Sequence, residues 1–203
     1  MDEEVFDVVI VGGGLAGCAA AYALAKAGVE VVVVERGAFS GSKNMTGGRL
    51  YGHSLEKLIP GFAESAPVER LITRERLSFL TDDSATTMDF ASASLGAPAC
   101  ASYAVLRAPF DQWLAEQAER EGAMFVNEIR VEDLIVRDGR VCGVRAGEDD
   151  MEAKVVLLAD GAVSLLGQKL GMVPPLDPHA MAVSAKEVIQ LDEKTVSDRF
   201  GCA

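Results

Sequence analysis

The chain has 203 residues, of which 49% are hydrophobic and 25% are charged, a composition typical of a globular protein with a buried core. Its formal net charge is −12 and it has no basic cluster, so we do not expect nucleic acid as a partner. An acidic surface repels phosphate backbones. The four cysteines include no C-x-x-C pair and are accompanied by only two histidines, so we expect no metal site.

The same features predict where the protein resides. Scattered single cysteines are typical of a reducing compartment. The first residues, "MDEEVFD", are acidic where a signal peptide has a positive region, and no apolar run reaches the length of a transmembrane helix. The sequence therefore predicts a cytoplasmic protein whose contact with the inner membrane is at most peripheral.

The chain begins with the pattern of a β-α-β unit. Residues 5–11 are an apolar run rich in valine, which predicts a strand covered on both faces of a parallel sheet. Residues 15–27 predict a helix that packs closely through its alanines and ends at Gly28. Residues 29–35 predict a second buried strand, reached by a right-handed crossover.

The next stretch is rich in glycine and then in short strand patterns. Residues 37–52 carry five glycines and predict a loop. A short helix is expected at residues 54–59, where Pro60 stops it. Within residues 64–105 the stretches "RLSFLT" and "TTMDFAS" predict short strands of a small antiparallel insertion.

A second helix is predicted at residues 108–122, with Pro109 in its first turn and Gly122 at its end. Its apolar residues share one face: Phe110, Trp113, Leu114 and Ala118. This pattern predicts a helix that packs against a core.

Strands dominate the predictions for the rest of the chain. "MFVNE" predicts a strand, and residues 130–147 predict a hairpin that turns at Asp138-Gly139 with type I′ geometry. "AKVVLLAD" predicts another buried strand, which leads into a helix at residues 163–170. Residues 181–191 predict a late strand.

The first candidate site is Gly12-x-Gly14-x-x-Gly17, between the first strand and the first helix. The three glycines allow a tight turn, the approach of a pyrophosphate and close helix–strand packing, respectively. The helix start at Leu15 and Ala16 offers free N–H groups to the anion. Glu35, at the end of the second strand, is placed to bind ribose hydroxyls and would repel a 2′-phosphate. The alternative, a glycine turn without a ligand, is much weaker in this context.

The second candidate is "KNMTGGR", residues 43–49. Gly47 and Gly48 would let the backbone lie against a flat ring or a phosphate. Lys43 and Arg49 could neutralise phosphate or a reduced flavin. A surface loop without a ligand is an equally good interpretation of the residues alone.

Two further positions end the candidate set. Arg107 precedes the second long helix and could reach the ligand of the glycine turn, although a solvated arginine is the simpler interpretation. Asp160-Gly161 follows a buried strand, where the aspartate could cap the next helix or bind a ligand in the crevice beyond the strand ends. The remaining conspicuous residues are interpreted as structural: Cys18, His53, Asp89, Asp111, Trp113 and His179.

Taken together, "VVIVGGGLAG", "KNMTGGRLYGHSLE", "VLRAPFDQWLAEQAEREGA" and "ADGAVSLLGQKLG" resemble the FAD-binding half of a flavoprotein of the glutathione-reductase structural class. Within that class they are similar to the FixC group. This group belongs with the electron-transfer-flavoprotein:quinone oxidoreductases and, more distantly, with the geranylgeranyl reductases. The resemblance implies an α/β fold with an FAD-binding, Rossmann-like parallel sheet and an antiparallel β insertion.

The resemblance also implies roles for residues. The glycine turn and Glu35 would hold the ADP half of FAD, with Arg36 beside the adenosine. Residues 43–49 would approach the flavin end, and Arg107 would contact the cofactor. The backbone of Val131, in a strand after "NEIR", would meet the adenine. The strand-end residues near the pyrophosphate would be Ala159, Asp160 and Gly161.

The implied activity is electron transfer through FAD. Electrons would come from an electron-transfer flavoprotein and pass to a quinone or a ferredoxin-like partner, in systems tied to nitrogen fixation or to carnitine-type metabolism. FAD would carry the redox chemistry, so no catalytic acid or base is assigned. Three alternatives stay open: an NAD-dependent dehydrogenase, a nucleotide-binding fragment without turnover, and an isoprenoid reductase.

The sequence departs from the family pattern in one respect. Family members are considerably longer and carry a late Gly-Asp motif that binds the ribityl chain and pyrophosphate, and nothing after Gly161 resembles it. We therefore expect one incomplete FAD-binding domain over residues 1–203. Residues 64–105 and about 176–203 would belong to a smaller, β-rich domain that faces the substrate.

Overall fold

The computed structural model describes residues 5–200 and centres on a six-stranded sheet. The strand order is β8-β2-β1-β11-β10-β9, and the first four of these strands are parallel. Strands β10 and β9 complete the sheet as an antiparallel hairpin. The bounds are Val5–Val11 (β1), Val31–Val34 (β2), Met124–Val126 (β8), Asp133–Arg137 (β9), Arg140–Ala146 (β10) and Asp149–Leu158 (β11). The predicted α/β fold with a mostly parallel sheet is confirmed.

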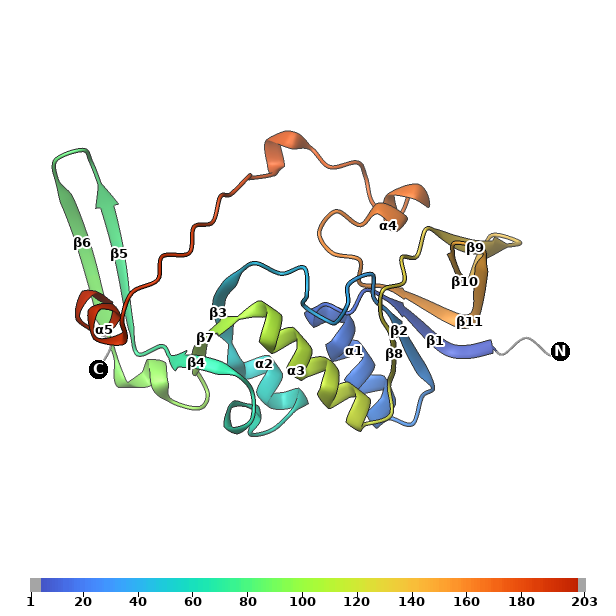
Figure 1. The fold of residues 1–203 in the computed structure, drawn as a ribbon, viewed down its shortest axis with the longest axis horizontal. Helices are drawn as coiled ribbons and strands as arrows, with labels where there is room; N and C mark the ends of the chain where they lie inside the picture. Colours follow the sequence, from blue (N-terminus) through green and yellow to red (C-terminus); the bar gives the residue numbers. More distant parts are fainter. Residues whose placement is uncertain (1–4, 201–203) are drawn as a thin grey trace.

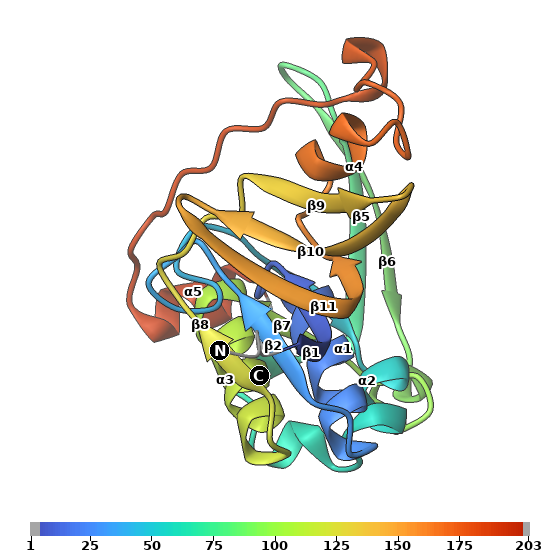
Figure 2. The same ribbon diagram turned by 90° about the vertical axis from the view of Figure 1, so that its right-hand side faces the viewer.

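Both faces of β1 and β2 are covered, as their continuous valine pattern predicts. Strand β11, predicted to be buried as well, leaves Val155 and Leu157 exposed. On one face Ile10 and Val33 pack against Ala21 of helix α1 (Leu15–Lys26) and Ala118 of helix α3 (Arg107–Arg120). On the other face Val9 and Val32 pack with Val144 of β10 and Leu166 of helix α4 (Leu165–Lys169). Figure 2 shows these layers, with α1 and α3 on one side of the sheet and the β9–β10 hairpin and α4 on the other.

Helix α1 ends as the sequence predicts, and its cap explains why β2 begins late. Gly28 adopts a φ of 79°, its N–H donates to the Ala25 carbonyl, and the N–H of Val29 reaches back to the Leu24 carbonyl. These two bonds form a Schellman cap. Val29 therefore belongs to the cap, and the strand predicted from residue 29 begins only at Val31.

The glycine-rich stretch forms a loop only up to residue 46. Residues Gly47–Tyr51 form strand β3, where the sequence predicted loop up to residue 52. This strand pairs antiparallel with β7 (Ser102–Leu106), which also pairs with β4 (Val68–Leu71). The pairing decides the conformation, because cross-strand hydrogen bonds outweigh the weak strand propensity of two glycines. Helix α2 (Gly52–Leu58) follows, close to its predicted position.

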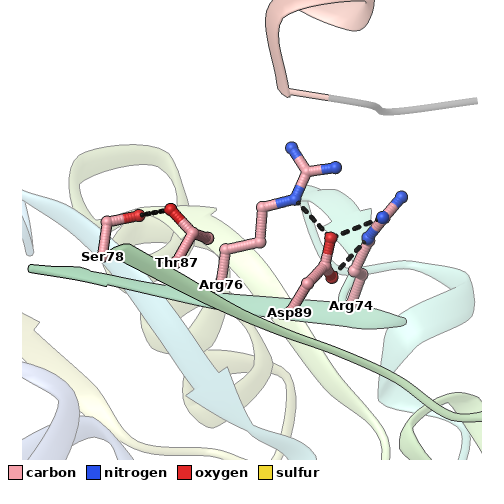
Figure 3. A network of polar contacts seen from close by, with 5 residues as sticks. All are labelled: Arg74, Arg76, Ser78, Thr87 and Asp89. Atoms are coloured by element: carbon pink, nitrogen blue, oxygen red, sulfur yellow. Dashed lines mark hydrogen bonds and ion pairs between the residues drawn. The ribbon is translucent and has the colours of Figure 1, made fainter. Parts of the chain in front are cut away.

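Strands β5 (Arg74–Leu80) and β6 (Ala85–Ala91) form a hairpin that projects from the body of the protein (Figure 1). One face is polar: Asp89 accepts hydrogen bonds from Arg74 and Arg76, and Ser78 bonds Thr87 (Figure 3). The Arg74 bond is the main reason why the pKa of Asp89 falls to about 2. The opposite face presents exposed apolar side chains: Leu77, Phe79, Met88 and Phe90. The hairpin is thus amphipathic.

Helix α3 and the β9–β10 turn follow their sequence signals closely. The buried residues of α3 include the whole predicted apolar face: Phe110, Trp113, Leu114 and Ala118. Gly122 follows the helix with a φ of 106°. In the hairpin turn Asp138 and Gly139 have φ values of 51° and 75°, which is the type I′ pattern that the Asp-Gly pair predicts.

The strand predicted at residues 181–191 is wrong. These residues form neither helix nor strand, and Val183, Val188 and Ile189 are exposed. A strand needs a hydrogen-bonded neighbour, and no strand within residues 5–200 pairs with this segment. Figure 1 shows it running as an extended chain from the α4 region to helix α5 (Glu193–Phe200). No helix within residues 5–200 is both long and apolar enough to span a membrane.

Candidate cofactor site

A cavity of about 600 Å³ opens at the carboxyl ends of β1, β2 and β11. Each of the three strands contributes its end and the residues after it: Val11, Gly12 and Gly14; Val34, Glu35 and Arg36; Ala159, Asp160 and Gly161. This is the position at which open α/β sheets bind their ligands. Residues far apart in the sequence therefore meet at one edge of the sheet.

The three glycines of the turn have three different surroundings. At Gly12 the φ is +106°, and a Cβ atom would lie 2.4 Å from the Ala159 carbonyl oxygen. At Gly17 a Cβ atom would lie 1.9 Å from the Gly12 carbonyl oxygen, so this glycine allows α1 to pack on the turn. At Gly14 a Cβ atom would meet no protein atom within 4 Å. Because Gly14 lines the cavity, its missing side chain leaves room for a ligand.

The first residues of α1 stand behind the turn rather than in the cavity wall. Leu15 is half-buried and Ala16 is exposed. Neither of them, nor Gly17, is among the residues whose atoms line the cavity. Their predicted contribution is limited to the backbone N–H groups of the helix start.

Glu35 is held firmly by the glycine-rich backbone around it. Its carboxylate accepts hydrogen bonds from the N–H groups of Gly13, at 2.8 Å, and Gly37, at 2.6 Å. A carboxylate has further lone pairs on both oxygens, so these bonds orient Glu35 without saturating it. The side chain is therefore preorganised to accept hydrogen bonds from ribose hydroxyls in the cavity.

Replacing Glu35 by alanine is expected to weaken the binding of FAD or ADP by about 1–3 kcal/mol, the scale of a lost hydrogen-bonding partner. The change also leaves the N–H groups of Gly13 and Gly37 without their acceptor. Titration of FAD against the purified variant measures the effect. Glu35→Gln keeps one acceptor oxygen, so its affinity for FAD should lie between those of wild type and Glu35→Ala. An unchanged affinity in the alanine variant would show that Glu35 does not bind the cofactor.

On one side of the cavity the loop before β3 meets the start of α3. Lys43, Asn44 and Arg107 line this side together with Gly41. Arg107 forms a two-bond ion pair with Asp111, at 2.7 and 2.8 Å, which raises the pKa of its guanidinium. The structure thus brings Lys43 and Arg107 to the same side of the cavity.

The glycines and the arginine of "KNMTGGR" lie outside the cavity wall. Gly47 and Gly48 belong to β3, and a Cβ atom at Gly47 would lie 2.7 Å from the Val105 carbonyl oxygen of β7. Arg49 donates to Ser102, at 2.9 Å, and pairs with Glu75, at 2.5 Å. Close strand packing accounts for Gly47, and Arg49 has protein partners in place of a ligand.

The opposite side of the cavity is built by the connection between β8 and β9. Val131 lies in this connection and not in the predicted strand. The reason is that the backbone before it forms hydrogen bonds with the loop after β2. The N–H groups of Glu128 and Ile129 donate to the carbonyls of Gly37 and Glu35. Val131 nevertheless lines the cavity, beside Arg130. The backbone bonds hold this connection against Glu35.

Asp160 serves as a cap and faces the cavity as well. Its carboxylate accepts a hydrogen bond of 3.2 Å from the N–H of Leu166, in the first turn of α4. Gly161 follows with a φ of +89°. Both residues line the cavity. The two interpretations that the sequence leaves open for Asp160 are therefore compatible.

The charges around the cavity suit an anionic ligand. The cavity wall carries five cations and three carboxylates in a chain whose net charge is −12. The cations are Arg36, Lys43, Arg107, Arg130 and Lys169, and the carboxylates are Glu35, Glu132 and Asp160. Within residues 5–200 neither Arg36, Lys43 nor Arg130 forms an ion pair. FAD carries a diphosphate and ribose hydroxyls, which match these cations, the open space at Gly14 and the carboxylate of Glu35. The residues present therefore fit FAD.

Several residues that line the cavity are not singled out by the sequence, among them Gly41, Asn44, Arg130 and Lys169. Lys169 pairs with Asp133 at 3.1 Å and donates to the carbonyl of Glu132. Asn44 lies within "KNMTGGR" but has no role of its own there, and Lys169 belongs to no predicted motif. Only the folded chain brings them to the strand ends.

Cys18 is a core residue, as predicted, and is expected to resist thiol reagents. It is buried on α1 behind the turn, and burial raises the pKa of its thiol to about 12. Since the thiolate is the reactive form, iodoacetamide at neutral pH should modify the exposed Cys100 and spare Cys18. Peptide mapping by mass spectrometry checks this, with unfolding in urea as the control that exposes both. Modification of Cys18 in the folded chain would contradict its burial.

The parallel sheet, the glycine turn and Glu35 define a dinucleotide-binding α/β protein. The model of the family described as "Glucose inhibited division protein A" matches residues 7–188. The chain therefore belongs to this family, and its cofactor is FAD.

Curated relatives point to the same class. Protein FixC from Shigella flexneri is 55% identical over 98% of this chain and 47% of its own length. The probable electron transfer flavoprotein-quinone oxidoreductase YdiS from Escherichia coli is 54% identical over the same shares. The predicted resemblance to the FixC group is thus confirmed. The chain spans about half the length of the curated relatives it matches.

Solved structures share the fold. A geranylgeranyl bacteriochlorophyll reductase-like protein from Thermoplasma acidophilum is 27% identical, with a TM-score of 0.68 over 82% of this chain and 42% of that chain. The FAD-dependent halogenase CndH, a myxobacterial protein, is 24% identical, with a TM-score of 0.66 over 81% of this chain and 39% of that chain. The second likeness supports the fold alone.

Proposed function

We propose that this chain forms the FAD-binding part of an oxidoreductase that accepts electrons from an electron-transfer flavoprotein and passes them to a quinone. The observation that carries the proposal is the cavity at the ends of β1, β2 and β11, whose glycine turn and Glu35 suit FAD. The choice of partners is supported by the 54% identity to a probable electron transfer flavoprotein-quinone oxidoreductase.

In this proposal the protein binds and orients, and FAD supplies the electron transfer when bound. The N–H groups at the start of α1 and the open space at Gly14 receive the diphosphate. Glu35 accepts hydrogen bonds from the adenosine ribose, while Arg36 and the backbone of Val131 lie beside the adenine. These roles are supported by the structure of the cavity, because its wall includes Gly14, Glu35, Arg36 and Val131. The first residues of α1 lie outside the wall.

The remaining candidates would act toward the other end of the cofactor. Lys43 and Arg107 would neutralise negative charge there, and Ala159, Asp160 and Gly161 would lie along the diphosphate and its neighbouring sugar. Gly47 would act indirectly, by letting β3 run close to β7 and so fixing the loop that carries Lys43. A Cβ atom at Gly48 would meet no atom within 4 Å, so Gly48 is given no role of this kind.

A chimera tests the electron path. Residues 1–203 replace the matching half of FixC from Escherichia coli, and FAD content shows that the chimera has folded. We expect a reduced electron-transfer flavoprotein to bleach the visible absorbance of the bound flavin, and a quinone to restore it. If a ferredoxin-like protein restored the flavin absorbance and the quinone did not, the electron acceptor would be a ferredoxin-like protein. A folded, FAD-loaded chimera that the electron-transfer flavoprotein does not reduce would contradict the proposal.

A second candidate activity is reduction of isoprenoid double bonds. The observation that favours it is the 27% identity and the TM-score of 0.68 to a geranylgeranyl bacteriochlorophyll reductase-like protein. The same chimera distinguishes the two activities. Reoxidation of its reduced flavin by a geranylgeranyl lipid, and not by a quinone, would favour the reductase.

We further propose that residues 64–105 and about 176–200 belong to a smaller, β-rich domain that faces the substrate. For residues 64–105 the proposal is supported by strands β4, β5 and β6, which lie outside the six-stranded sheet, and by the uncovered apolar face of the β5–β6 hairpin. Residues 176–200 contain no strand and contribute helix α5. A lipophilic quinone would reach such a domain from a membrane surface, which agrees with a peripheral location at the inner membrane. Flotation of the FAD-loaded chimera with phospholipid vesicles tests this contact, and its absence would contradict the location.

A further inference from the structure

Asp111 is a buried carboxylate beside the cavity, and three side-chain hydrogen bonds converge on it. Its side chain is 0% exposed. Its oxygens accept from Nε of Arg107, at 2.7 Å, from the terminal Nη2 of Arg107, at 2.8 Å, and from Nδ2 of Asn44, at 2.7 Å. Both donors line the cavity, whereas Asp111 does not. The carboxylate thus stands directly behind two side chains of the cofactor site.

The same place joins the loop before β3 to the start of α3. The φ of Gly41 is +92°, and a Cβ atom there would lie 2.8 Å from Cβ of Asp111 and 2.7 Å from the Ala108 carbonyl oxygen. The N–H of Arg107 donates to the carbonyl of Thr46. The loop and the helix are therefore in close contact at both ends of the segment that carries Lys43 and Asn44.

Stability alone is a weak reason for such a carboxylate. Replacing a buried ion pair by well-packed apolar residues is often neutral or stabilising, because burial removes the hydration of both charges. A role in fixing the direction of its partners is better supported, because both oxygens of Asp111 hold Arg107 in a planar fork. Arg107 then keeps three of its five N–H donors for a ligand.

We propose that Asp111 is a positioning residue for the cofactor, which acts through Arg107 and Asn44. It orients the guanidinium and the amide at the cavity wall and holds the Lys43 loop on α3. The proposal rests on the proposed function, since the ligand whose anionic groups Arg107 meets is FAD. It assigns a function to a residue whose pattern in the sequence shows only a buried position on a helix.

The test compares Asp111→Asn with wild type in titrations of FAD against the purified chain. The amide cannot accept the full fork from Arg107, so we expect the dissociation constant to rise about tenfold, the order associated with one hydrogen bond to a charged group. Asp89→Asn is the matched control, because Asp89 also accepts a two-bond fork from an arginine but lies on the β5–β6 hairpin. The control should bind FAD like wild type.

A double-mutant cycle shows whether the effect passes through Arg107. If Asp111 positions Arg107, Asp111→Asn should weaken FAD affinity much less in a protein that already carries Arg107→Gln than in wild type. An equal fall in FAD affinity in both backgrounds would overturn the proposal. Urea unfolding of each variant without FAD records stability separately, and a merely structural role would move only that measurement.

Asn44→Ala gives a second route if Asp111→Asn does not fold. It removes one donor to Asp111 without opening the buried position, and a weaker FAD affinity is again expected. Unchanged affinity in both Asn44→Ala and Arg107→Gln would overturn the proposal. The two proposals fail in different ways: wild type that does not bind FAD contradicts the proposed function, whereas wild type that binds FAD no better than Asp111→Asn contradicts only the positioning role.

Discussion

Replacing Gly14 with valine is expected to abolish FAD binding and leave the fold in place. A Cβ atom at this position meets no protein atom within 4 Å, so the fold has room for a side chain. Gly14 lines the cavity at the start of α1, where the diphosphate is expected to lie, so the same side chain occupies the ligand's space. We expect the affinity for FAD to fall by about 100-fold or more, since a blocked pyrophosphate site loses several hydrogen bonds.

Titration of FAD and far-ultraviolet circular dichroism together test this expectation. Gly48→Val is the matched control: a Cβ atom there also has no neighbour within 4 Å, and the structure places Gly48 in β3, outside the cavity wall. The control should keep its FAD. A Gly14 variant that binds FAD as wild type does would show that the ligand does not approach the turn.

Replacing Gly17, three residues further on, is expected to destabilise the fold itself. A Cβ atom at Gly17 would lie 1.9 Å from the Gly12 carbonyl oxygen, a backbone atom that cannot move without breaking the turn. Helix α1 would have to shift off β1, and we expect a loss of about 3 kcal/mol or more of unfolding free energy. Alanine should already show the effect, because the overlap arises at Cβ.

The midpoint of urea unfolding, measured without FAD, tests the Gly17 prediction. Ala16→Val is a suitable comparison, since Ala16 is exposed on the neighbouring position of the same helix and should lose only a few tenths of a kcal/mol. If Gly17→Ala unfolded at the same urea concentration as wild type, the close packing of α1 on the turn would be refuted.

The sequence predicts best the elements whose signals are local. The valine runs of β1 and β2, the Schellman glycine after α1 and the Asp138-Gly139 turn each carry their own chemistry in adjacent residues. The clearest failures are strand β3 and residues 181–191. Gly47–Tyr51 becomes a strand through its pairing with β7, and residues 181–191 do not, because no described strand lies beside them. Strand formation depends on a partner that is remote in the sequence.

The candidate site shows the same limit. Gly12, Gly14 and Glu35 could be identified because a motif of fixed spacing ties them to a turn, a helix start and a strand end. The hydrogen bond between Asn44 and Asp111 joins residues 67 positions apart, and no local sequence pattern around either residue predicts it. The position of Arg107 alone favours a solvated arginine, and only the resemblance to a family favours contact with the cofactor. The fork from Asp111 gives a physical reason for its orientation.

The strongly acidic composition hides a local reversal of charge. The net charge is −12, yet the cavity at the strand ends is lined by five cations against three carboxylates. A cluster of cations in a low-dielectric cleft concentrates anions locally, whatever the sign of the rest of the surface. The net charge of the whole chain therefore argues against nucleic acid as a partner. It does not argue against a diphosphate ligand in the cavity.

The most direct test of the account is the visible absorption spectrum of the purified chain, with its chromophore released and identified. We expect a yellow protein that releases FAD at about one molecule per chain, because one glycine turn and the cavity beside it form one FAD site. A colourless protein that cannot be reconstituted with added FAD would contradict the claim that this cavity is a competent FAD site.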